Sequence, residues 1–252
     1  MNVFSKSKES GFTLIELIVV IIIMGVLASA TTVFIKFSTV IYSEATDRDQ
    51  LVSSARFAIE RLNREVRNAL PNSLRLDPTK QCLEFTPIIG SSIYTDIPVF
   101  PDNKSNTITV IESNALPNSS GGFSAIVYPL TFDDVYPIIE SDSDKIHAIN
   151  NIVSTGEQWV ITLNDDVVFS AHSPTQRIYF IETNNSVNYC VLNNTLTRNN
   201  ILMADNINSA LSSFDVMEAT LQRNAMVQIH LQFEKNDENI TFENEVQVLN
   251  VP

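Results

Sequence analysis

The most chemically suggestive residues lie near the N-terminus, where a single carboxylate enters an apolar segment. Gly11 and Phe12 are followed, after three further residues, by Glu16, and no charged residue occurs from Leu17 to Ile35. That uncharged run is long enough to cross a membrane as a helix. A carboxylate at the edge of such a segment is costly unless it has a cationic partner. The spacing therefore predicts charge pairing at a membrane, with Glu16 as the anion.

The octet that begins at Ser10 resembles the cleavage and methylation site of type IV prepilins. The resemblance implies that a prepilin peptidase cuts after Gly11 on the cytoplasmic side. It implies that the new N-terminal residue, Phe12, is then methylated on its amine. It also implies that Glu16 pairs with the N-terminal amine of a neighbouring subunit during assembly.

Two other kinds of N-terminal segment share part of this pattern. Lys6, Lys8, an apolar stretch and the sequence Ala-Ser-Ala at 28–30 also fit a secretory signal with an A-x-A cleavage site. A glutamate inside the apolar core is unusual for such a signal, and the apolar character continues beyond the cleavage site. A simple one-pass anchor, with Glu16 reaching the headgroups, is the other alternative. Intramembrane acids are by default functional, which favours the prepilin interpretation.

Positive charge before the apolar run predicts the orientation of the chain. Lys6, Lys8 and the initial amine make the short N-terminal segment basic, so it is expected to stay in the cytoplasm. We therefore expect a single-pass inner-membrane protein with its C-terminal head in the periplasm, carried to the cell surface where a pilus is assembled.

The remaining charge is strongly acidic and unevenly distributed. Residues 1–80 contain 10 Lys and Arg against 8 Asp and Glu, and residues 81–252 contain 6 against 21. The net charge is thus +2 in the first part and −15 in the second, in agreement with −13 for all 252 residues. An acidic surface repels phosphate backbones, so we expect no nucleic acid partner.

A single long helix is predicted to follow the leader. It would extend from Phe12 to Leu70, which is about 59 residues or roughly 88 Å, and Pro71 would end it. After Lys36 its pattern becomes amphipathic. The predicted apolar stripe consists of Leu51, Ala55, Ala58, Ile59, Leu62, Val66, Ala69 and Leu70. The expected divisions are a leader (1–11), a transmembrane half (12–36), an amphipathic half (37–71) and a β-rich head (72–252).

Phe57 lies nearly opposite the apolar stripe on the expected helix. An isolated exposed aromatic residue is common and needs no explanation. The alternative is a contact with the helix of another subunit, and the sequence leaves both interpretations open. The exposed face is also expected to carry three i,i+4 ion pairs: Arg56–Glu60, Glu60–Arg64 and Arg61–Glu65.

Short β-favouring runs separated by Asn, Ser, Asp, Pro and Gly make up the rest of the chain. With the long helix they predict an α+β fold, and the resemblance implies a pilin-like helix packed on an antiparallel β-sheet head. The predicted strands are 83–89, 107–112, 124–128, 159–163, 177–182, 187–192, 225–234 and 240–249.

The connections between these strands give further expectations. Residues 183–186 and 236–239 are predicted to form two hairpin turns, and the last hairpin is expected to slip in register near Phe242. Residues 205–213 are compatible with a short helix. Residues 98–118 are polar and loop-like apart from the strand predicted there.

Cys82 and Cys190 are the two cysteines of the chain. An even number of cysteines in an oxidising compartment predicts a disulfide, and the alternative is two buried free thiols. A bond between them would close a loop of about 100 residues and contribute roughly 2–5 kcal/mol.

No sequence motif for catalysis or for a cofactor is apparent. Phosphate-binding loops, dinucleotide-binding glycine patterns, H-E-x-x-H and G-x-S-x-G are all missing. His147, His172 and His230 lie in unrelated contexts, which favours structural roles. Three acidic pairs lack the spacing of a calcium loop and are interpreted as solvated loop acids: Asp133–Asp134, Asp142–Asp144 and Asp165–Asp166. We expect neither enzymatic activity nor a bound metal or cofactor.

Two positions in the apolar run bear on the kind of pilin. Gly25 matches a position where pilins often have glycine. Val33 stands at the twenty-second residue of the expected mature chain, where many major pilins have proline. The resemblance therefore implies a minor pilin or pseudopilin rather than a filament-forming major pilin.

The amphipathic helix and the C-terminus resemble one pilin group more closely. Residues 56–73 and 246–252 are similar to the O-type minor pilins of mannose-sensitive haemagglutinin (MSHA) pili, and the helix is also similar to J-type pseudopilins of type II secretion. The resemblance implies a structural role in initiating or assembling a pilus, with prepilin peptidase, an inner-membrane assembly platform and other minor and major pilins as partners. The alternative from another class is a pilus-tip adhesin.

Overall fold

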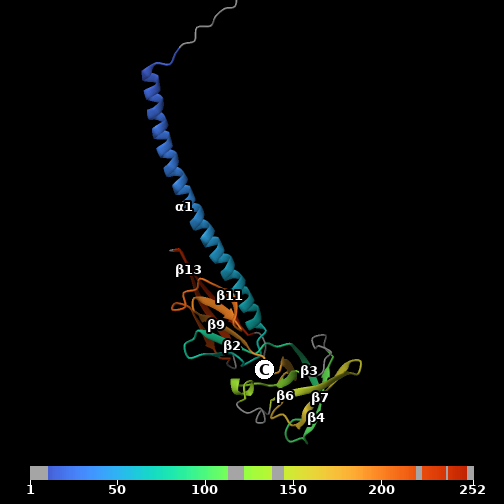
Figure 1. Ribbon diagram of the computed structural model, residues 1–252. Coiled ribbons are helices and arrows are strands. Elements are labelled where there is room, and N and C mark those ends of the chain that lie inside the picture. Colours follow the sequence, from blue (N-terminus) through green and yellow to red (C-terminus); the bar gives the residue numbers. More distant parts are fainter. Residues whose placement is uncertain (1–10, 113–121, 138–144, 220–222, 237, 249–252) are drawn as a thin grey trace, which may run out of the picture. The chain divides into compact units, whose positions relative to one another are not determined.

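The computed structural model describes residues 11–112, 122–137, 145–219, 223–236 and 238–248 (Figure 1). One α-helix, α1 (Leu14–Arg67), is 54 residues long. The chain divides into two compact units between Gln50 and Leu51, and each unit is described by itself.

α1 ends three residues before the predicted end at Leu70. Asn68 N–H bonds to the Glu65 carbonyl at 3.1 Å and Ala69 N–H to the Val66 carbonyl at 3.0 Å, so the last turn tightens to a 3₁₀ pattern. Leu70 N–H then bonds to the carbonyl of Thr86 at 2.8 Å. The backbone has therefore joined the head before Pro71 is reached.

The second part of α1 buries the stripe that the sequence predicts. All eight predicted stripe residues are buried, whereas Phe57 on the opposite side is 58% exposed. The prediction of a helix packed on antiparallel β-sheets is confirmed. The stripe comprises Leu51, Ala55, Ala58, Ile59, Leu62, Val66, Ala69 and Leu70.

The head contains two open antiparallel sheets beside α1. The five-stranded sheet has the order β1-β2-β9-β10-β11, and the three-stranded sheet has the order β12-β13-β14. Their strands are β1 (Arg75–Leu76), β2 (Cys82–Phe85), β9 (Val187–Leu192), β10 (Thr195–Arg198), β11 (Ile201–Ala204), β12 (Ser213–Met217), β13 (Met226–Lys235) and β14 (Glu238–Gln247).

The other six strands form a closed antiparallel barrel in the order β3-β4-β7-β6-β5-β8. They are β3 (Gly90–Asp96), β4 (Ser105–Ile111), β5 (Phe123–Val127), β6 (Ile146–Ser154), β7 (Gln158–Val167) and β8 (Arg177–Glu182), with a 3₁₀ turn, η1 (Phe132–Asp134), after β5. Apolar side chains such as Trp159, Phe169 and Phe180 fill the barrel. It is therefore a packed module, with its own core.

The barrel is an insertion between two neighbouring strands of the five-stranded sheet. β2 and β9 are antiparallel partners, and Phe85 lies opposite Val187. The chain leaves this sheet at Thr86, builds the barrel and returns at Ser186. The core between α1 and the two sheets contains no barrel residue among the described residues. A third small cluster, including Leu70, Ile126 and Tyr179, joins the two parts.

Two consecutive Asn-Asn turns shape the β9-β10-β11 meander. Asn193 and Asn194 have φ of 51° and 61°, and Asn199 and Asn200 have φ of 47° and 66°. Two-residue hairpin turns of type I′ need positive φ at both central positions, and asparagine tolerates that conformation better than most residues. The paired asparagines thus fix the meander.

Several expectations about the strands are wrong. Residues 183–186 do not form a hairpin turn, because β8 belongs to the barrel and β9 to the open sheet. The hairpin of β13 and β14 is confirmed, but its register runs without a slip from Met226 opposite Gln247 to Lys235 opposite Glu238. Residues 205–212 form turns and a bridge at Ile207 rather than a helix, and β12 begins at Ser213. β4 lies wholly within 98–118, where it confirms the strand predicted at 107–112 and corrects the loop-like interpretation; residues 113–118 lie outside the described residues.

Candidate functional site

The sequence places the expected processing site immediately before the first turn of α1. Gly11, Phe12 and Thr13 lack regular structure, and the helix begins at Leu14. The Thr13 hydroxyl accepts a hydrogen bond from Glu16 N–H at 3.4 Å, as an N-cap residue does. The T-x-x-E spacing is that of a capping box. The junction after Gly11 therefore lies in a short non-helical segment adjoining a capped helix.

Glu16 lies in the first helical turn and is exposed. A carboxylate is favourable there because it faces the partial positive charge of the helix N-terminus. Phe12, four residues earlier, is 81% exposed. Both groups to which the resemblance assigns a role are thus accessible to another chain.

The first part of α1 is apolar around its whole circumference. By length and composition, α1 contains one segment able to cross a membrane, with a mean hydropathy of 2.7 and no buried residue. Its few hydroxyl groups are satisfied within the helix: Ser29 donates to the Val26 carbonyl at 2.8 Å and Thr31 to the Leu27 carbonyl at 2.6 Å. Such bonds keep polar side chains compatible with a lipid environment. The Ala-Ser-Ala sequence at 28–30 lies within the helix, well after its first turn.

Glu65 connects α1 to the five-stranded sheet. Its carboxylate accepts hydrogen bonds from Arg61 at 3.1 Å, from Arg198 at 2.8 Å and from the Tyr189 hydroxyl at 3.0 Å. Burial opposes ionisation of Glu65, but the bonds from Arg198 and Arg61 outweigh it and lower the pKa of this carboxyl. The i,i+4 pair with Arg61 is the predicted one. Arg198 and Tyr189 come from distant strands and were not predicted.

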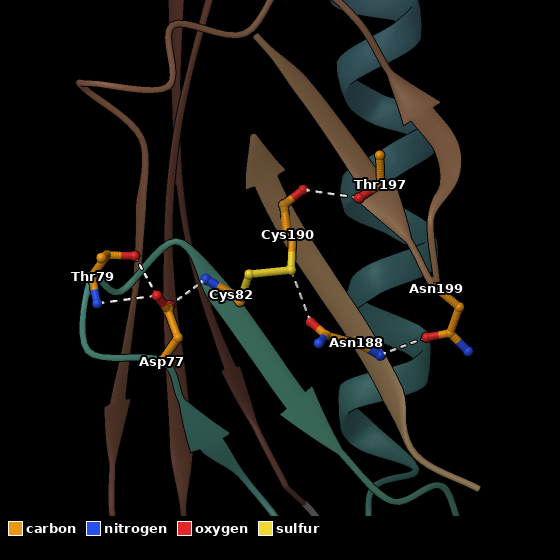
Figure 2. Close-up of a disulfide and its surroundings, with 7 residues drawn as sticks. All are labelled: Asp77, Thr79, Cys82, Asn188, Cys190, Thr197 and Asn199. Atoms are coloured by element: carbon orange, nitrogen blue, oxygen red, sulfur yellow. Dashed lines mark hydrogen bonds between the residues drawn. A yellow bond between two sulfur atoms is a disulfide. The ribbon is translucent and has the colours of Figure 1, made fainter. Parts of the chain in front are cut away.

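Cys82 and Cys190 form a disulfide that joins β2 to β9 (Figure 2). The two residues lie directly opposite each other in the antiparallel ladder. Asp77 supports the start of β2, since its carboxylate accepts bonds from Cys82 N–H at 2.6 Å and Thr79 N–H at 3.1 Å. The bond therefore closes the two strands between which the barrel is inserted.

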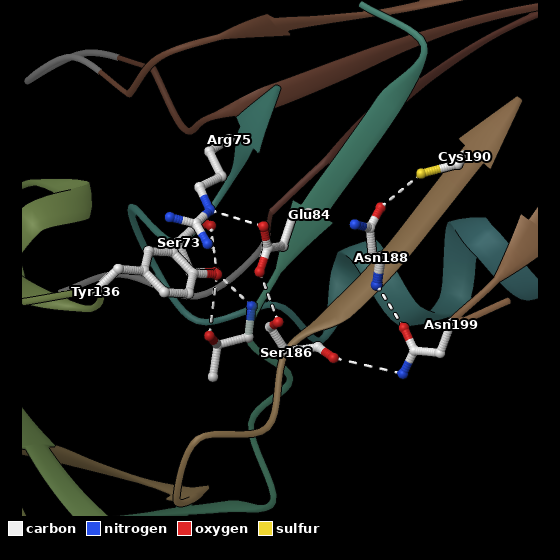
Figure 3. A network of polar contacts seen from close by, with 9 residues as sticks. Ser73, Arg75, Glu84, Tyr136, Ser186, Asn188, Cys190 and Asn199 are labelled. Atoms are coloured by element: carbon white, nitrogen blue, oxygen red, sulfur yellow. Dashed lines mark hydrogen bonds and ion pairs between the residues drawn. The ribbon is translucent and has the colours of Figure 1, made fainter. Parts of the chain in front are cut away.

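A polar network lies next to this insertion point (Figure 3). Arg75 pairs with Glu84 at 2.8 Å and lies 4.0 Å from the centre of the Tyr136 ring, within cation–π range. Tyr136 donates its hydroxyl to the Ser73 carbonyl at 3.0 Å, and Ser186 donates to Glu84 at 2.6 Å. One network thus connects Glu84 and Ser186, at the two ends of the insertion, with Tyr136, which lies within the insertion.

The pKa shifts in this network favour an ionised Glu84 and a neutral Tyr136, the charge states that their contacts need. Burial opposes ionisation of Glu84, but the bonds from Arg75 and Ser186 outweigh it and lower its pKa. Burial raises the pKa of Tyr136 to about 12, so its hydroxyl remains a donor. A cavity of about 610 Å³ adjoins the network, with Glu84, Tyr136, Asp165, Glu182 and Asn185 in its lining.

The other residues considered for catalysis or metal binding are dispersed. His147 packs edge-on against Phe169, the His172 ring lies 3.3 Å from the Tyr94 hydroxyl, and His230 faces Glu243. No cluster of three potential metal ligands occurs among the described residues. Asp142 and Asp144 lie outside the described residues.

Two of the acidic pairs are not loop acids of the kind expected. Asp134 is half-buried, pairs with Lys145 at 2.8 Å and accepts bonds from Leu130 N–H and Thr131 N–H. Asp165 and Asp166 are exposed, but they belong to strand β7. Asp134 therefore has a structural function in its turn.

Comparison with known proteins supports the class that this geometry indicates. The family model described as "Prokaryotic N-terminal methylation motif" matches residues 6–32. With the apolar first part of α1 and the antiparallel sheets that pack on its second part, this match supports a type IV pilin-like protein. No curated protein and no solved structure gives a significant match.

The general role follows from the motif. It supports a function of the pilin or pseudopilin type, with prepilin peptidase processing and pilus assembly partners. Single-pass membrane anchoring agrees with α1, which contains the one candidate span among the described residues.

Proposed function

We propose that this chain is a minor pilin or pseudopilin that serves the initiation or assembly of a type IV pilus. The observation that carries the proposal is the methylation motif over residues 6–32, with Gly11, Phe12 and Glu16 at its processing and assembly positions. Prepilin peptidase removes residues 1–11, and the amine of Phe12 is methylated. Glu16 of the assembling chain pairs with the N-terminal amine of a neighbouring subunit.

The proposed organisation of the chain keeps the divisions that the sequence predicts. Residues 12–36 span the inner membrane, residues 37–71 form the amphipathic half of the helix, and residues 72–252 form the periplasmic head. Two positive residues before the span support this orientation. The disulfide between Cys82 and Cys190 agrees with an oxidising compartment.

Within this class we favour an O-type minor pilin of an MSHA-like pilus. The support is the likeness of residues 56–73 and 246–252 to that group, and Val33 in place of the proline of many major pilins. The alternative is a J-type pseudopilin of type II secretion. The genes next to this one discriminate between the two, since each subunit is encoded with its own machine.

A pilus-tip adhesin is the alternative of a different kind. The observation that favours it is the cavity of about 610 Å³ beside the barrel, whose lining includes Glu84, Tyr136, Asp165 and Glu182. A chain that binds a surface ligand but does not promote piliation would favour the adhesin.

The mature N-terminus tests the proposal. We expect the intact mass of the membrane-derived protein to correspond to a chain that starts at Phe12 and carries one methyl group. A start at Thr31 would instead establish a cleaved secretory signal.

In the same strain, Glu16→Ala should leave the chain anchored and the head folded but reduce piliation, because the neighbouring amine loses its anion. Normal piliation by this variant would contradict the role of Glu16.

A further inference from the structure

Two edge strands of the head, β11 and β14, have no neighbour on their outer sides within the described residues. The other two sheet edges, β1 and β12, lie close to each other. Phe214 N–H bonds to the Lys80 carbonyl at 2.8 Å, and Lys80 forms an ion pair with Asp215. The open edges are therefore the two ends of the strand array, one in each sheet.

β11 has the composition of a strand that accepts a partner. It contains no charged residue, and Ile201 and Leu202 are 64% and 59% exposed. Soluble proteins usually protect an open edge with charged residues, proline or a bulge, because an apolar edge pairs with other strands. Ile201 and Leu202 leave this edge apolar and exposed.

Two arginines adjoin the start of β11, and an exposed Asp205 follows its end. Ile201 lies opposite Arg198 in the ladder, and Arg198 shares Glu65 with Arg61. Two guanidinium groups on one carboxylate leave a net positive charge, and the Arg61 side chain is 43% exposed. Phe57 lies one helical turn before Arg61. We call Phe57, Arg61, Arg198, Ile201 and Leu202 the β11 surface.

β14 has the complementary composition. Glu238, Glu243 and Glu245 make this strand acidic, and the Glu243 side chain is 79% exposed. Half-buried Ile240 and Phe242 alternate with these polar positions. Because Ile240 and Phe242 pack against the helix–sheet core, the match with β11 rests on the glutamates of β14 and the arginines beside β11.

The two edges lie on opposite flanks of α1. Arg198 on β10, the strand next to β11, bonds to Glu65, and Asn244 on β14 bonds to Asn63 at 2.6 Å. Residues two apart on a helix point about 200° apart. β11 and β14 therefore lie on opposite sides of one chain. When two chains of the same orientation lie side by side, β11 of one chain faces β14 of the other.

The strand directions are also suitable. β11 starts at Ile201, opposite Arg198 and level with the C-terminal end of α1, and runs towards the turn that contains Asn194. The Asn194 carbonyl accepts a bond from Ile207 N–H, and Ile207 bridges to Phe233, which lies opposite Ile240. β14 thus begins at the level where β11 ends and runs the opposite way. In two chains of equal orientation these strands are antiparallel.

We infer that β11 docks the β14 strand of a second copy of this chain by antiparallel strand addition. Backbone hydrogen bonds would give affinity, and the exposed apolar and charged side chains would give specificity. The contact uses a different surface on each partner, so it repeats without closing a dimer. The inference rests on the proposed function, because anchoring in one membrane gives all copies the same orientation. Even a low-abundance subunit would then occur in pairs or short rows.

Cysteine cross-linking of the full-length chain in membranes tests the inference. Cys82 and Cys190 are joined and no other cysteine exists, so an introduced cysteine is the one reactive thiol. Chains with Leu202→Cys and Thr241→Cys, each carrying its own tag, are co-expressed and treated with a short bis-maleimide. We expect a covalent dimer that contains both tags. When either variant is expressed alone, the yield of covalent dimer should be much lower.

Matched variants make the test specific. Ile201→Glu should lower the cross-linked fraction by about tenfold, equivalent to about 1.4 kcal/mol in association, because it faces the acidic β14. Leu192→Glu replaces an exposed leucine of the same sheet, 48% exposed, and should leave the yield unchanged. Val153→Cys on the barrel should not cross-link to Thr241→Cys.

The outcomes separate this inference from the proposed function. A homotypic Leu202→Cys dimer in equal yield would show face-to-face pairing of β11 and overturn the inference. So would the absence of any cross-link in chains whose mass shows cleavage after Gly11. Chains that are anchored but never cleaved would overturn the proposed function itself.

Discussion

Glu65 shows how one residue on the exposed edge of an amphipathic helix becomes a structural anchor. Arg61 is its neighbour on the helix, whereas Arg198 and Tyr189 reach it from strands more than a hundred residues later. A carboxylate held by three donors is worth more than a surface ion pair, because the bonds are charge-assisted and partly shielded from water. Glu65 therefore fixes the side of α1 that faces β10.

Replacement of Glu65 should weaken the head, and the effect should depend on pH. Because the pKa of Glu65 is lowered in the folded chain, its stabilisation is present above its ordinary value of 4.5 and is lost as the pH falls through the lower folded pKa. Glu65→Gln should cost about 1–3 kcal/mol at pH 7. The difference from the unmodified chain should shrink towards pH 3.

Denaturant unfolding of the two chains between pH 7 and pH 3 measures this difference. Glu60→Gln, on the exposed face of the same helix, is the matched control and should have little effect. A cost for Glu65→Gln that stays constant down to pH 3 would mean that ionisation of Glu65 is not what stabilises the contact.

At the residue scale, the sequence predicted only those contacts that are local or paired by chemistry. Arg61 and Glu65 are four residues apart on a helix, and two cysteines have only one intramolecular pairing. Arg198 gives no signal of its own, because a lone arginine in a strand is compatible with any partner. The distance along the chain between Glu65 and Arg198 is set by the topology, which residue types alone do not specify.

The second half of α1 is the element with the clearest division between buried and exposed faces. Leu62 is fully buried, whereas Phe57 is 58% exposed. Leu62→Ala should destabilise the head by about 2–5 kcal/mol, because it removes buried apolar atoms and leaves a cavity.

Thermal or denaturant unfolding measures this loss, and Phe57→Ala provides the control. We expect Phe57→Ala to change the unfolding free energy by at most about 0.5 kcal/mol. Equal losses for the two variants would show that Phe57 is also packed within the head.

Element prediction succeeded where side-chain pattern and turn chemistry agreed. β8 and β9 have the predicted bounds, and the β13–β14 hairpin has the expected alternation. The strands that were missed, such as β10 and β11, are four residues long; β10 contains two threonines and an arginine, and β11 contains Leu, Met and Ala, which favour helices. Their signal was the two Asn-Asn pairs six residues apart, since asparagine supplies the positive φ of a type I′ turn. The turn residues at 183–186 misled because they connect two different sheets.

At the scale of the whole molecule, the head consists of a helix–sheet unit and an inserted barrel with separate cores. Phe85 and Val187, which flank the insertion, are opposite each other. Replacement of residues 86–186 by Asn-Gly should therefore connect β2 and β9 as an ordinary hairpin. The shortened chain should stay folded but be less stable, since the small cluster around Leu70 is lost.

Circular dichroism melting and mass mapping of Cys82–Cys190 check this prediction. A cooperative transition with the disulfide in place is the expected result. The full-length chain with Leu74→Ala serves as a reference, because it weakens the helix–sheet core without removing the barrel. A deletion chain that melts without a cooperative transition would show that the barrel is required for the rest to fold.

The position of the disulfide determines how the head would respond to a mechanical load. Two segments connect the barrel to the five-stranded sheet, and both begin at the same end of the β2–β9 ladder. Tension on the barrel would therefore open the ladder one residue pair at a time. Phe85–Val187 would separate first, followed by Glu84–Asn188 and Leu83–Tyr189. The next pair is Cys82–Cys190. Peeling would stop at this covalent bond, and the force would pass to the helix–sheet unit as a whole.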